Sequence, residues 1–129
     1  MNQSEYLDKI VTMAIEDIEI ASVWLYGSRA RNAFTEESDY DVAVLYSQHI
    51  KDPFERRLRP ELLSRAWSRA SEQEINVIDI SLAPLPLAMT VLNDDRLLYD
   101  AAPGQRLKLE QGLMSKWELD YLYSESHYA

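Results

Sequence analysis

Residues 41–46, with the sequence Asp-Val-Ala-Val-Leu-Tyr, form the clearest strand signal in the chain. β-Branched and aromatic residues are prominent in this short apolar run, as is typical of a buried strand. Residues 21–26 and residues 74–81 have the same character, and residues 96–99 predict a short edge strand. We therefore predict a small β-sheet.

Helical patterns lie between these strands. Apolar residues recur at helical spacing over residues 4–19. Asp52 followed by Pro53 is typical of a helix cap and a first helical residue, and we expect that helix to continue through Trp67. Pro60 lies inside this stretch, where it is expected to split or delay the helix.

Two further patterns complete the chain. Residues 87–93 predict a short helix, and Pro103 is expected to begin the last one. The order of elements predicts a fold of the α/β (α+β) class, in which a small mixed β-sheet is flanked by helices. We expect a single domain over residues 1–129, because single cores of this size commonly fold alone.

The chain is acidic, with 22 aspartate and glutamate residues, 13 lysine and arginine residues and a formal net charge of −9. This balance argues against direct binding of nucleic acid, whose phosphates attract basic surfaces. The absence of cysteine excludes disulfides, thiolate zinc sites and cysteine nucleophiles. Residues 1–8 lack the pattern of a signal peptide, and no apolar run approaches the roughly 20 residues of a membrane span. We expect a cytoplasmic protein that binds no membrane.

The pattern with the most chemical content is Gly27-Ser28, followed after ten residues by Asp39-Tyr40-Asp41. Side chains alternate along a strand, so Asp39 and Asp41 are expected to present two carboxylates on one side at the strand entry. Taken singly, a Gly-Ser pair is a common turn and Asp-x-Asp is a common strand end. Their combination at this spacing indicates an active site.

Asp79 is a candidate third acid. It lies in the apolar string of residues 75–80, where a lone carboxylate is costly to bury. If this strand pairs with residues 41–46, Asp79 is expected to converge with Asp39 and Asp41. Three carboxylates so near to one another repel, and a hard divalent cation such as magnesium would remove that repulsion. The alternative is that Asp79 is a strand-end residue that reaches solvent.

The Gly27-Ser28 pair suits the phosphate side of such a site. Glycine allows the backbone to approach a triphosphate closely, and the serine hydroxyl can donate a hydrogen bond. Residues 28–32 are expected to open a short helix, whose free N–H groups and dipole would favour an anion. Arg29 and Arg31 are candidate cations for the same phosphates.

Two runs of sequence resemble the minimal nucleotidyltransferase (MNT) family of the polymerase-β-like nucleotidyltransferase superfamily. They are Leu-Tyr-Gly-Ser-Arg-Ala-Arg at residues 25–31 and Ser-Asp-Tyr-Asp-Val-Ala-Val at residues 38–44. The resemblance extends from the leading helix to Asp79. Asn32 stands where such proteins often have glycine, and Tyr40 stands where a smaller aliphatic residue is common. Neither change removes a ligand.

The resemblance implies the polymerase-β-like fold and a magnesium-dependent transfer from ATP. Asp39 and Asp41 would bind two Mg²⁺ ions on the triphosphate, and Asp79 would share one ion and accept the proton of the attacking hydroxyl. That hydroxyl would attack the α-phosphorus in line, and pyrophosphate would leave.

The short chain also resembles the antitoxins of HEPN/MNT toxin–antitoxin modules. This implies an antitoxin of a type VII-like module that transfers AMP from ATP to a tyrosine of a cognate HEPN ribonuclease toxin and so inactivates it. Two alternatives remain, namely an antitoxin that neutralises its toxin by binding alone and a small-molecule nucleotidyltransferase of the aminoglycoside type. The few residues after Asp79 leave little room for an acceptor domain, which counts against the second alternative.

Two groups of side chains outside the motif have ambiguous roles. An aromatic helix face is more often core than interface, although aromatics are enriched in interfaces; the last predicted helix carries Trp117, Tyr121, Tyr123 and Tyr128. A row of arginines is expected to be a solvated helix face, with contact to nucleotide or partner as the alternative. These arginines are Arg56, Arg57, Arg59, Arg65 and Arg69.

Overall fold

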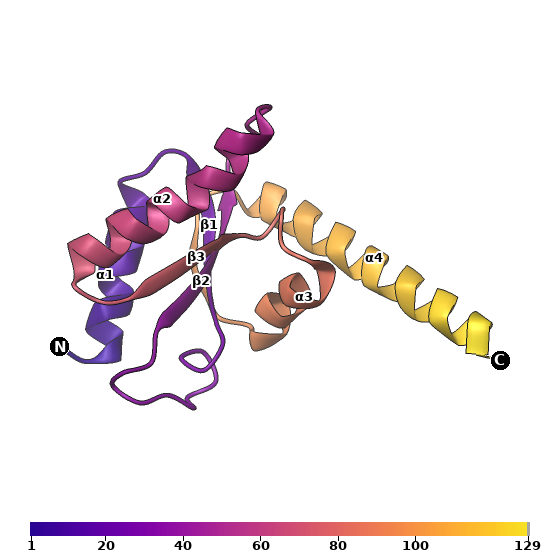
Figure 1. Cartoon of the computed structure of the whole chain (residues 1–129), viewed down its shortest axis with the longest axis horizontal. Helices are drawn as coiled ribbons and strands as arrows, with labels where there is room; N and C mark the ends of the chain where they lie inside the picture. The colour runs from indigo at the N-terminus through magenta and orange to yellow at the C-terminus, as the bar shows by residue number, and fades with distance from the viewer. Residues whose placement is uncertain (129) are drawn as a thin grey trace.

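The computed structural model describes residues 1–128, with side chains through Leu122. Helices and strands alternate along the chain, with β1 and β2 as the one pair of strands joined without a helix (Figure 1). The elements are α1 (Gln3–Ile15), β1 (Ile20–Tyr26), β2 (Tyr40–Tyr46), α2 (Pro53–Ser71), β3 (Ile75–Asp79), α3 (Leu85–Asp94), β4 (Leu97–Asp100) and α4 (Pro103–Tyr128).

The four strands form one mixed sheet in the order β3-β2-β1-β4. β1 pairs antiparallel with both β2 and β4, and β3 runs parallel to β2. This arrangement confirms the predicted small mixed sheet flanked by helices. It places the end of β1 beside the start of β2, where the two parts of the sequence motif lie, with the start of β3 on the other side of β2.

Each face of the sheet packs against its own pair of helices. On one face, Val42 and Val44 of β2 lie in a core with residues of α1 and with Trp67 of α2. On the other face, Ala43 and Leu45 pack against α3 and against the first half of α4. Since side chains alternate along β2, the odd-numbered residues of this strand face α3.

Helix α1 is shorter than predicted, ending at Ile15 instead of residue 19. The backbone turns at Asp17, whose carboxylate accepts a hydrogen bond from the N–H of Glu19 at 3.0 Å. Such aspartate turns compete with helix continuation. Ile18, counted in the apolar periodicity, is 93% exposed in this turn.

Helix α2 confirms the predicted cap. The carboxylate of Asp52 accepts hydrogen bonds from the N–H groups of Phe54 and Glu55 at 2.8 and 3.0 Å, and Pro53 occupies the first helical turn. Pro60 neither splits nor delays the helix, which continues to Ser71. Trp67, one turn or more beyond Pro60, packs into the core below the sheet.

Helix α4 extends away from the rest of the molecule along its second half (Figure 1). Leu113 is buried at 8% exposure, whereas Trp117 is 45% exposed and Leu122 is 59% exposed. The expectation that this aromatic segment belongs to the core is therefore wrong for Trp117. The side chains of Tyr123 and Tyr128 lie outside the described residues. Within residues 1–128, no helix has the length and apolar character needed to cross a membrane.

Candidate active site

Asp39 and Asp41 lie together at the entry of β2. Asp41 pairs with Tyr26 across the antiparallel ladder, next to Gly27, and belongs to the α3 face of the sheet. Both carboxylates accept a hydrogen bond from one amide group, that of Asn76. The predicted convergence of the two carboxylates is therefore present.

Asn76 provides this contact from the neighbouring strand. It is the register partner of Asp41 in the parallel pair of β2 and β3. Its Nδ2 donates to Asp39 Oδ2 and to Asp41 Oδ1, each at 3.3 Å. Sequence reasoning missed this residue, although the alternation of Ile75 and Val77 as buried residues marks Asn76 as facing the other side.

The acidic groups at the entry of β2 shift one another's pKa values. Burial raises the pKa of Asp41, the hydrogen bond from Asn76 lowers it, and the negative charge of Asp39 raises it again, with a net upward shift. The pKa of Glu74, which precedes β3, is also raised, because its carboxyl shares a hydrogen bond with Asp39 and is repelled by that charge. Negative charge has therefore accumulated around Asp39, as at a cation site.

Tyr26 lies beside this cluster. Burial, and then the negative charge of Asp41, raise the pKa of Tyr26 to about 12. The phenol therefore stays protonated at neutral pH, next to the carboxylates, and can act as a hydrogen-bond donor.

Asp79 is not part of the cluster. The predicted pairing of β3 with β2 is present, but the register places Asp79 opposite Val44, and its side chain belongs to the α2 face. It lies three residues from Asn76, and residues an odd number apart on a strand face opposite sides. Asp79 is 5% exposed and accepts hydrogen bonds from the N–H and the hydroxyl of Ser81 at 2.9 and 2.6 Å. The structure corrects the expected convergence of three acids.

Gly27 is fitted closely to Asp41. Its φ of +78° lies in the left-handed region, and a Cβ atom at this position would be 2.9 Å from Asp41 Oδ2. Glycine is therefore required both for the backbone conformation and for the approach of the turn to the carboxylate.

The segment after Gly27 is a turn and not the predicted short helix. The carbonyl of Gly27 accepts hydrogen bonds from the N–H groups of Ala30 and Arg31, both at 3.1 Å. Asn32 then adopts a φ of 58°, which ends any helical continuation and which asparagine tolerates. Within the described residues, the N–H groups of Ser28 and Arg29 donate no hydrogen bond. Successive free N–H groups in a turn suit an anion.

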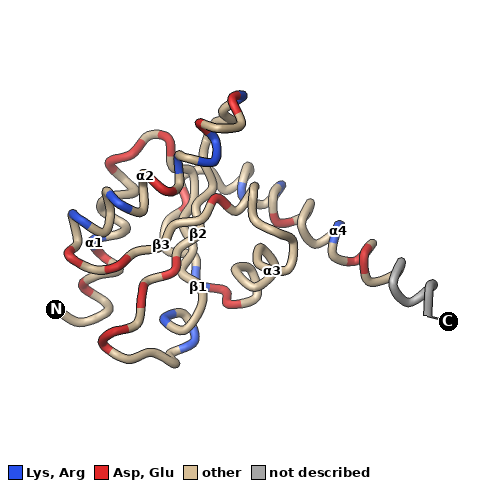
Figure 2. The backbone as a smooth tube through the Cα atoms, viewed as in Figure 1, with Lys and Arg blue, Asp and Glu red and all other residues tan. Residues whose placement is uncertain are grey.

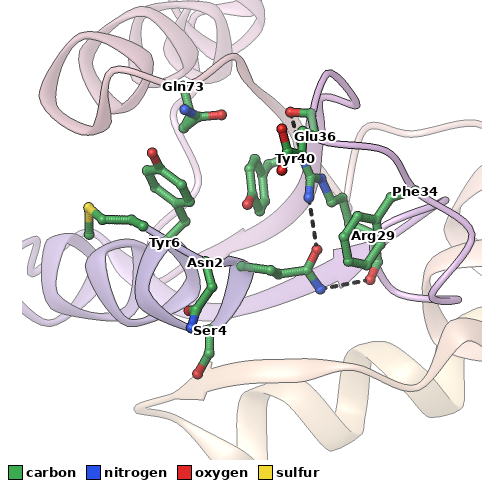
Figure 3. Close-up of a pocket in the computed structure, with 10 residues that line it drawn as sticks. Asn2, Ser4, Tyr6, Arg29, Phe34, Glu36, Tyr40 and Gln73 are labelled. Carbon is green, nitrogen blue, oxygen red and sulfur yellow. Dashed lines mark hydrogen bonds between the residues drawn. The ribbon is translucent and has the colours of Figure 1, made fainter.

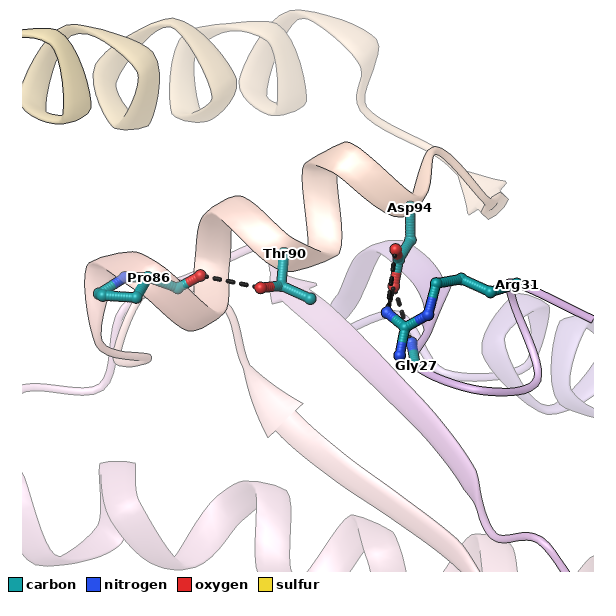
Figure 4. Close-up of polar contacts among 5 residues, drawn as sticks. All are labelled: Gly27, Arg31, Pro86, Thr90 and Asp94. Atoms are coloured by element: carbon teal, nitrogen blue, oxygen red, sulfur yellow. Dashed lines mark hydrogen bonds and ion pairs between the residues drawn. The ribbon is translucent and has the colours of Figure 1, made fainter. Parts of the chain in front are cut away.

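Asp94, the last residue of α3, fixes this turn (Figure 4). Its Oδ2 accepts a hydrogen bond from the N–H of Gly27 at 2.8 Å, and its carboxylate forms an ion pair with Arg31 at 3.0 Å. An acidic residue at a helix C-terminus is unfavourable by itself, so these contacts explain its presence. No local sequence signal could have joined Asp94 to Gly27, which lies 67 positions away.

The two candidate phosphate ligands Arg29 and Arg31 differ in position. Arg29 is buried at 4% exposure, and its guanidinium donates to the carbonyls of Glu36 and Ser38 and to the side chain of Gln3. It also lies over the rings of Phe34 and Tyr40.

These contacts make Arg29 a structural residue. Figure 3 shows it in the wall of a cavity of about 650 Å³ near the start of α1. Tyr40, which lines this cavity, belongs to the α1 and α2 core, so the cavity is on the face away from Asp41. Arg31, with a side chain 53% exposed beside Gly27, remains accessible to a ligand.

The arginines of α2 are separated from the carboxylates. Figure 2 shows them along α2, which covers the opposite face of the sheet from α3. Arg56 and Arg59 donate to the carbonyls of residues 48, 50 and 51 at the start of the helix. They do not form a phosphate site together with Asp39 and Asp41.

The donor set fits a magnesium ion that shares its coordination with a substrate. Among the residues that the structure describes, no three histidine, cysteine, aspartate or glutamate side chains are arranged to hold a metal ion. Asp39 and Asp41 supply two hard oxygen ligands, and Mg²⁺ is commonly held by one or two carboxylates together with phosphates and water. The free N–H groups beside Gly27 are suitably located for those phosphates.

Comparison with known proteins gives a family match and a fold match. A family model described as polymerase beta, nucleotidyltransferase, matches residues 8–103. No curated protein sequence matches the chain.

Several solved structures share the fold. A crystal structure of a toxin–antitoxin with AMP-PNP contains a chain that is 20% identical, with a TM-score of 0.71 over 92% of this chain and 90% of that one. A complex of a tri-AMPylated Shewanella oneidensis HEPN toxin with an MNT antitoxin contains a chain that is 18% identical, with a TM-score of 0.69 over 96% and 92%. The toxin–antitoxin MntA-HepT matches with 18% identity and a TM-score of 0.69 over 95% and 92%. At these identities the similarity concerns the fold.

Proposed function

The chain belongs to the polymerase beta nucleotidyltransferase family, and on that premise we propose that it is an antitoxin that transfers AMP from ATP to a tyrosine of a HEPN toxin. The observation that carries the proposal is the convergence of the Asp39 and Asp41 carboxylates beside the Gly27 turn. This arrangement brings a cation site and a candidate phosphate site together at the entry of one strand.

In this proposal each residue has a distinct task. Asp39 and Asp41 hold magnesium, and the N–H groups of Ser28 and Arg29 bind phosphate oxygens, with Arg31 as an accessible cation. The ion, when bound, stabilises the charge that develops on the entering and leaving oxygens. The tyrosine oxygen forms a bond to the α-phosphorus, the bond to the β-phosphate oxygen breaks, pyrophosphate leaves, and the phenolic proton is released to water.

The role first expected for Asp79 needs revision. Its carboxylate is buried on the other face of the sheet and accepts two hydrogen bonds from Ser81. We therefore assign Asp79 a structural task and leave it out of the transfer. Arg29 is omitted for a similar reason, because its guanidinium is engaged by the carbonyls of Glu36 and Ser38; its main-chain N–H remains available.

A protein acceptor is supported by the exposed apolar side chains of α4. Large apolar side chains that remain exposed together commonly mark protein–protein contacts. On this helix they include Leu107, Met114, Trp117, Leu119 and Leu122. Of the solved structures that share the fold, one has a tri-AMPylated HEPN toxin as the partner. A small acceptor such as an aminoglycoside would not account for these exposed apolar side chains.

The second candidate function is neutralisation by binding alone. The same exposed apolar side chains of α4 favour it, because they would serve a tight complex without any transfer. The two functions differ in what happens to the partner, since only the enzyme changes its mass.

The test uses the purified chain, magnesium, labelled ATP and a HEPN-domain protein as the candidate acceptor. We expect label on a tyrosine of that protein and loss of its ribonuclease activity. The double variant Asp39→Asn with Asp41→Asn should form the same complex and leave the partner unlabelled. A wild-type chain that suppresses the ribonuclease while its mass stays unchanged would favour the binding function.

A further inference from the structure

The amide of Asn76 bridges the two carboxylates of the candidate metal site. Its Nδ2 lies 3.3 Å from an oxygen of Asp39 and 3.3 Å from an oxygen of Asp41. Neighbouring carboxylates repel each other, and a shared donor reduces that repulsion without adding charge. Asn76 is exposed, so packing does not account for its orientation.

Asn76 also occupies the position on β3 from which a third acid would reach this pair. It is the register partner of Asp41 and lies on the same face. Asp79, the acid within the same strand, lies on the opposite face and accepts two hydrogen bonds from Ser81. The strand beside Asp41 therefore contributes a neutral donor where a carboxylate would fit.

We propose that Asn76 is a positioning residue that holds Asp39 and Asp41 together before a cation binds and keeps the site at two carboxylate ligands. The proposal rests on the assignment of those two aspartates as the magnesium ligands. A site with two carboxylates has open coordination positions, which nucleotide phosphates fill. Cation and nucleotide therefore increase each other's affinity, because such coupling is reciprocal.

The experiment measures Mn²⁺ binding by electron paramagnetic resonance, with and without a non-hydrolysable ATP analogue. In the wild-type chain the analogue is expected to tighten Mn²⁺ binding at least about tenfold. Asn76→Ala should weaken Mn²⁺ binding about 10- to 100-fold. Asn76→Asp should tighten binding of Mn²⁺ alone about tenfold and make it depend less on the analogue, since charge on the ligands sets affinity. If Asn76 had a purely structural role, both variants would bind Mn²⁺ more weakly than wild type does.

Thermal unfolding without metal separates positioning from direct coordination. Asn76→Ala should lower the melting temperature by about 2–4 °C in the absence of Mn²⁺, and Asn76→Asp should lower it further because three carboxylates repel. Both losses should shrink when Mn²⁺ is added. An unchanged melting temperature for metal-free Asn76→Ala would overturn the proposal.

Two matched variants serve as controls. Asp79→Asn removes an acid from the same strand on the other face, and Glu74→Gln removes the carboxyl that contacts Asp39. Asp79→Asn should leave Mn²⁺ affinity within about twofold, whereas Glu74→Gln removes a carboxyl in contact with Asp39 and should change that affinity less than Asn76→Ala does. If Glu74→Gln weakens binding as much as Asn76→Ala does, Glu74 is a third ligand and the proposal fails. A wild-type chain that binds Mn²⁺ with this pattern but transfers no AMP would instead contradict the proposed function.

Discussion

Asp41 and Asp79 lie on neighbouring strands of one sheet, yet their surroundings differ. Asp79 is 5% exposed, and the following turn satisfies it through the N–H and hydroxyl of Ser81. Asp41 faces another carboxylate, a bridging amide and a glycine without a side chain. A carboxylate whose hydrogen bonds come from the adjacent turn has a structural task. A carboxylate that lacks enough local hydrogen-bond donors is available to a cation. The comparison predicts that changes at the two sites affect different properties.

The largest expected difference comes from the pair Asp41→Asn and Asp79→Asn. Asp41→Asn should reduce AMP transfer about 10³-fold, because it removes a charged ligand at the reacting phosphates. Asp79→Asn should leave transfer within about twofold and cost about 1 kcal/mol of stability, since asparagine still accepts from Ser81. Single-turnover transfer and thermal unfolding measure the two effects. Equal losses of transfer in both variants would contradict the comparison.

Gly27→Ala should give the next largest effect, a loss of transfer of about 10²-fold, because small displacements of reacting groups have effects of this size. The added Cβ would contact Asp41 Oδ2 at 2.9 Å, and the φ of +78° disfavours any side chain. Kinetics on a variant whose circular dichroism matches wild type provide the measurement. Gly104→Ala is the control, since a Cβ there meets no atom within 4 Å.

Asp94→Ala should raise the KM for ATP about tenfold, as expected when a hydrogen bond to a charged group is lost. The carboxylate holds the N–H of Gly27 and the guanidinium of Arg31, so its removal frees the turn. Arg31→Ala leaves the bond to Gly27 in place but removes both the ion pair with Asp94 and the candidate phosphate cation. If Asp94→Ala lowers stability with KM unchanged, Asp94 has no part in nucleotide binding.

Ser81→Ala tests the structural side of the comparison. It removes the hydroxyl that donates to Asp79 at 2.6 Å but leaves the N–H at 2.9 Å. We expect a loss of about 1 kcal/mol in the free energy of unfolding, with AMP transfer unchanged. Chemical denaturation gives the first quantity. A loss of transfer would indicate that Asp79 communicates with the active site.

The smallest expected effect concerns a third carboxylate, Asp100 of β4. Burial alone would raise the pKa of Asp100, but hydrogen bonds from Arg106 and Ser22 outweigh it and the net shift is downward. A group with a lowered folded pKa stabilises the protein above its unfolded pKa, and that contribution is lost as the pH falls through the folded value. The melting temperatures of wild type and Asp100→Asn should therefore differ at pH 7 and converge as the pH falls below the ordinary aspartate pKa and through the lowered folded value. A constant difference would exclude the ion pair as its cause.

The sequence predicts the site best where its parts are local. Gly27, Asp39 and Asp41 lie at the ends of two strands that follow each other in the chain, so spacing and alternation were sufficient to bring them together. Asn76 and Asp94 come from later elements, and their positions depend on register and on the packing of α3.

Two predicted site side chains are engaged elsewhere in the structure, for physical reasons. Asp79 was chosen for its charge in an apolar strand, but the parity of its position places it on the other face of the sheet. Arg29 was chosen for its nearness to Gly27, but its guanidinium is used to hold the carbonyls of residues 36 and 38. Alternation along residues 75–79 separates Asp79 from Asn76, but the register with β2 decides which of them lies beside Asp41. The demand of a loop for donors is not visible in the local sequence.

The bond between Gly27 and Asp94 has a consequence for the order in which the site is assembled. The hairpin of β1 and β2 closes a short loop, so Gly27 and Asp41 meet early and at small entropic cost. Asp94 arrives only when α3, 67 positions further along, docks on the sheet. A nascent chain that has emerged only through β3 already has its carboxylates, while the turn beside them still lacks the hydrogen bond that fixes it. The nucleotide side of the site is therefore expected to become rigid last during synthesis.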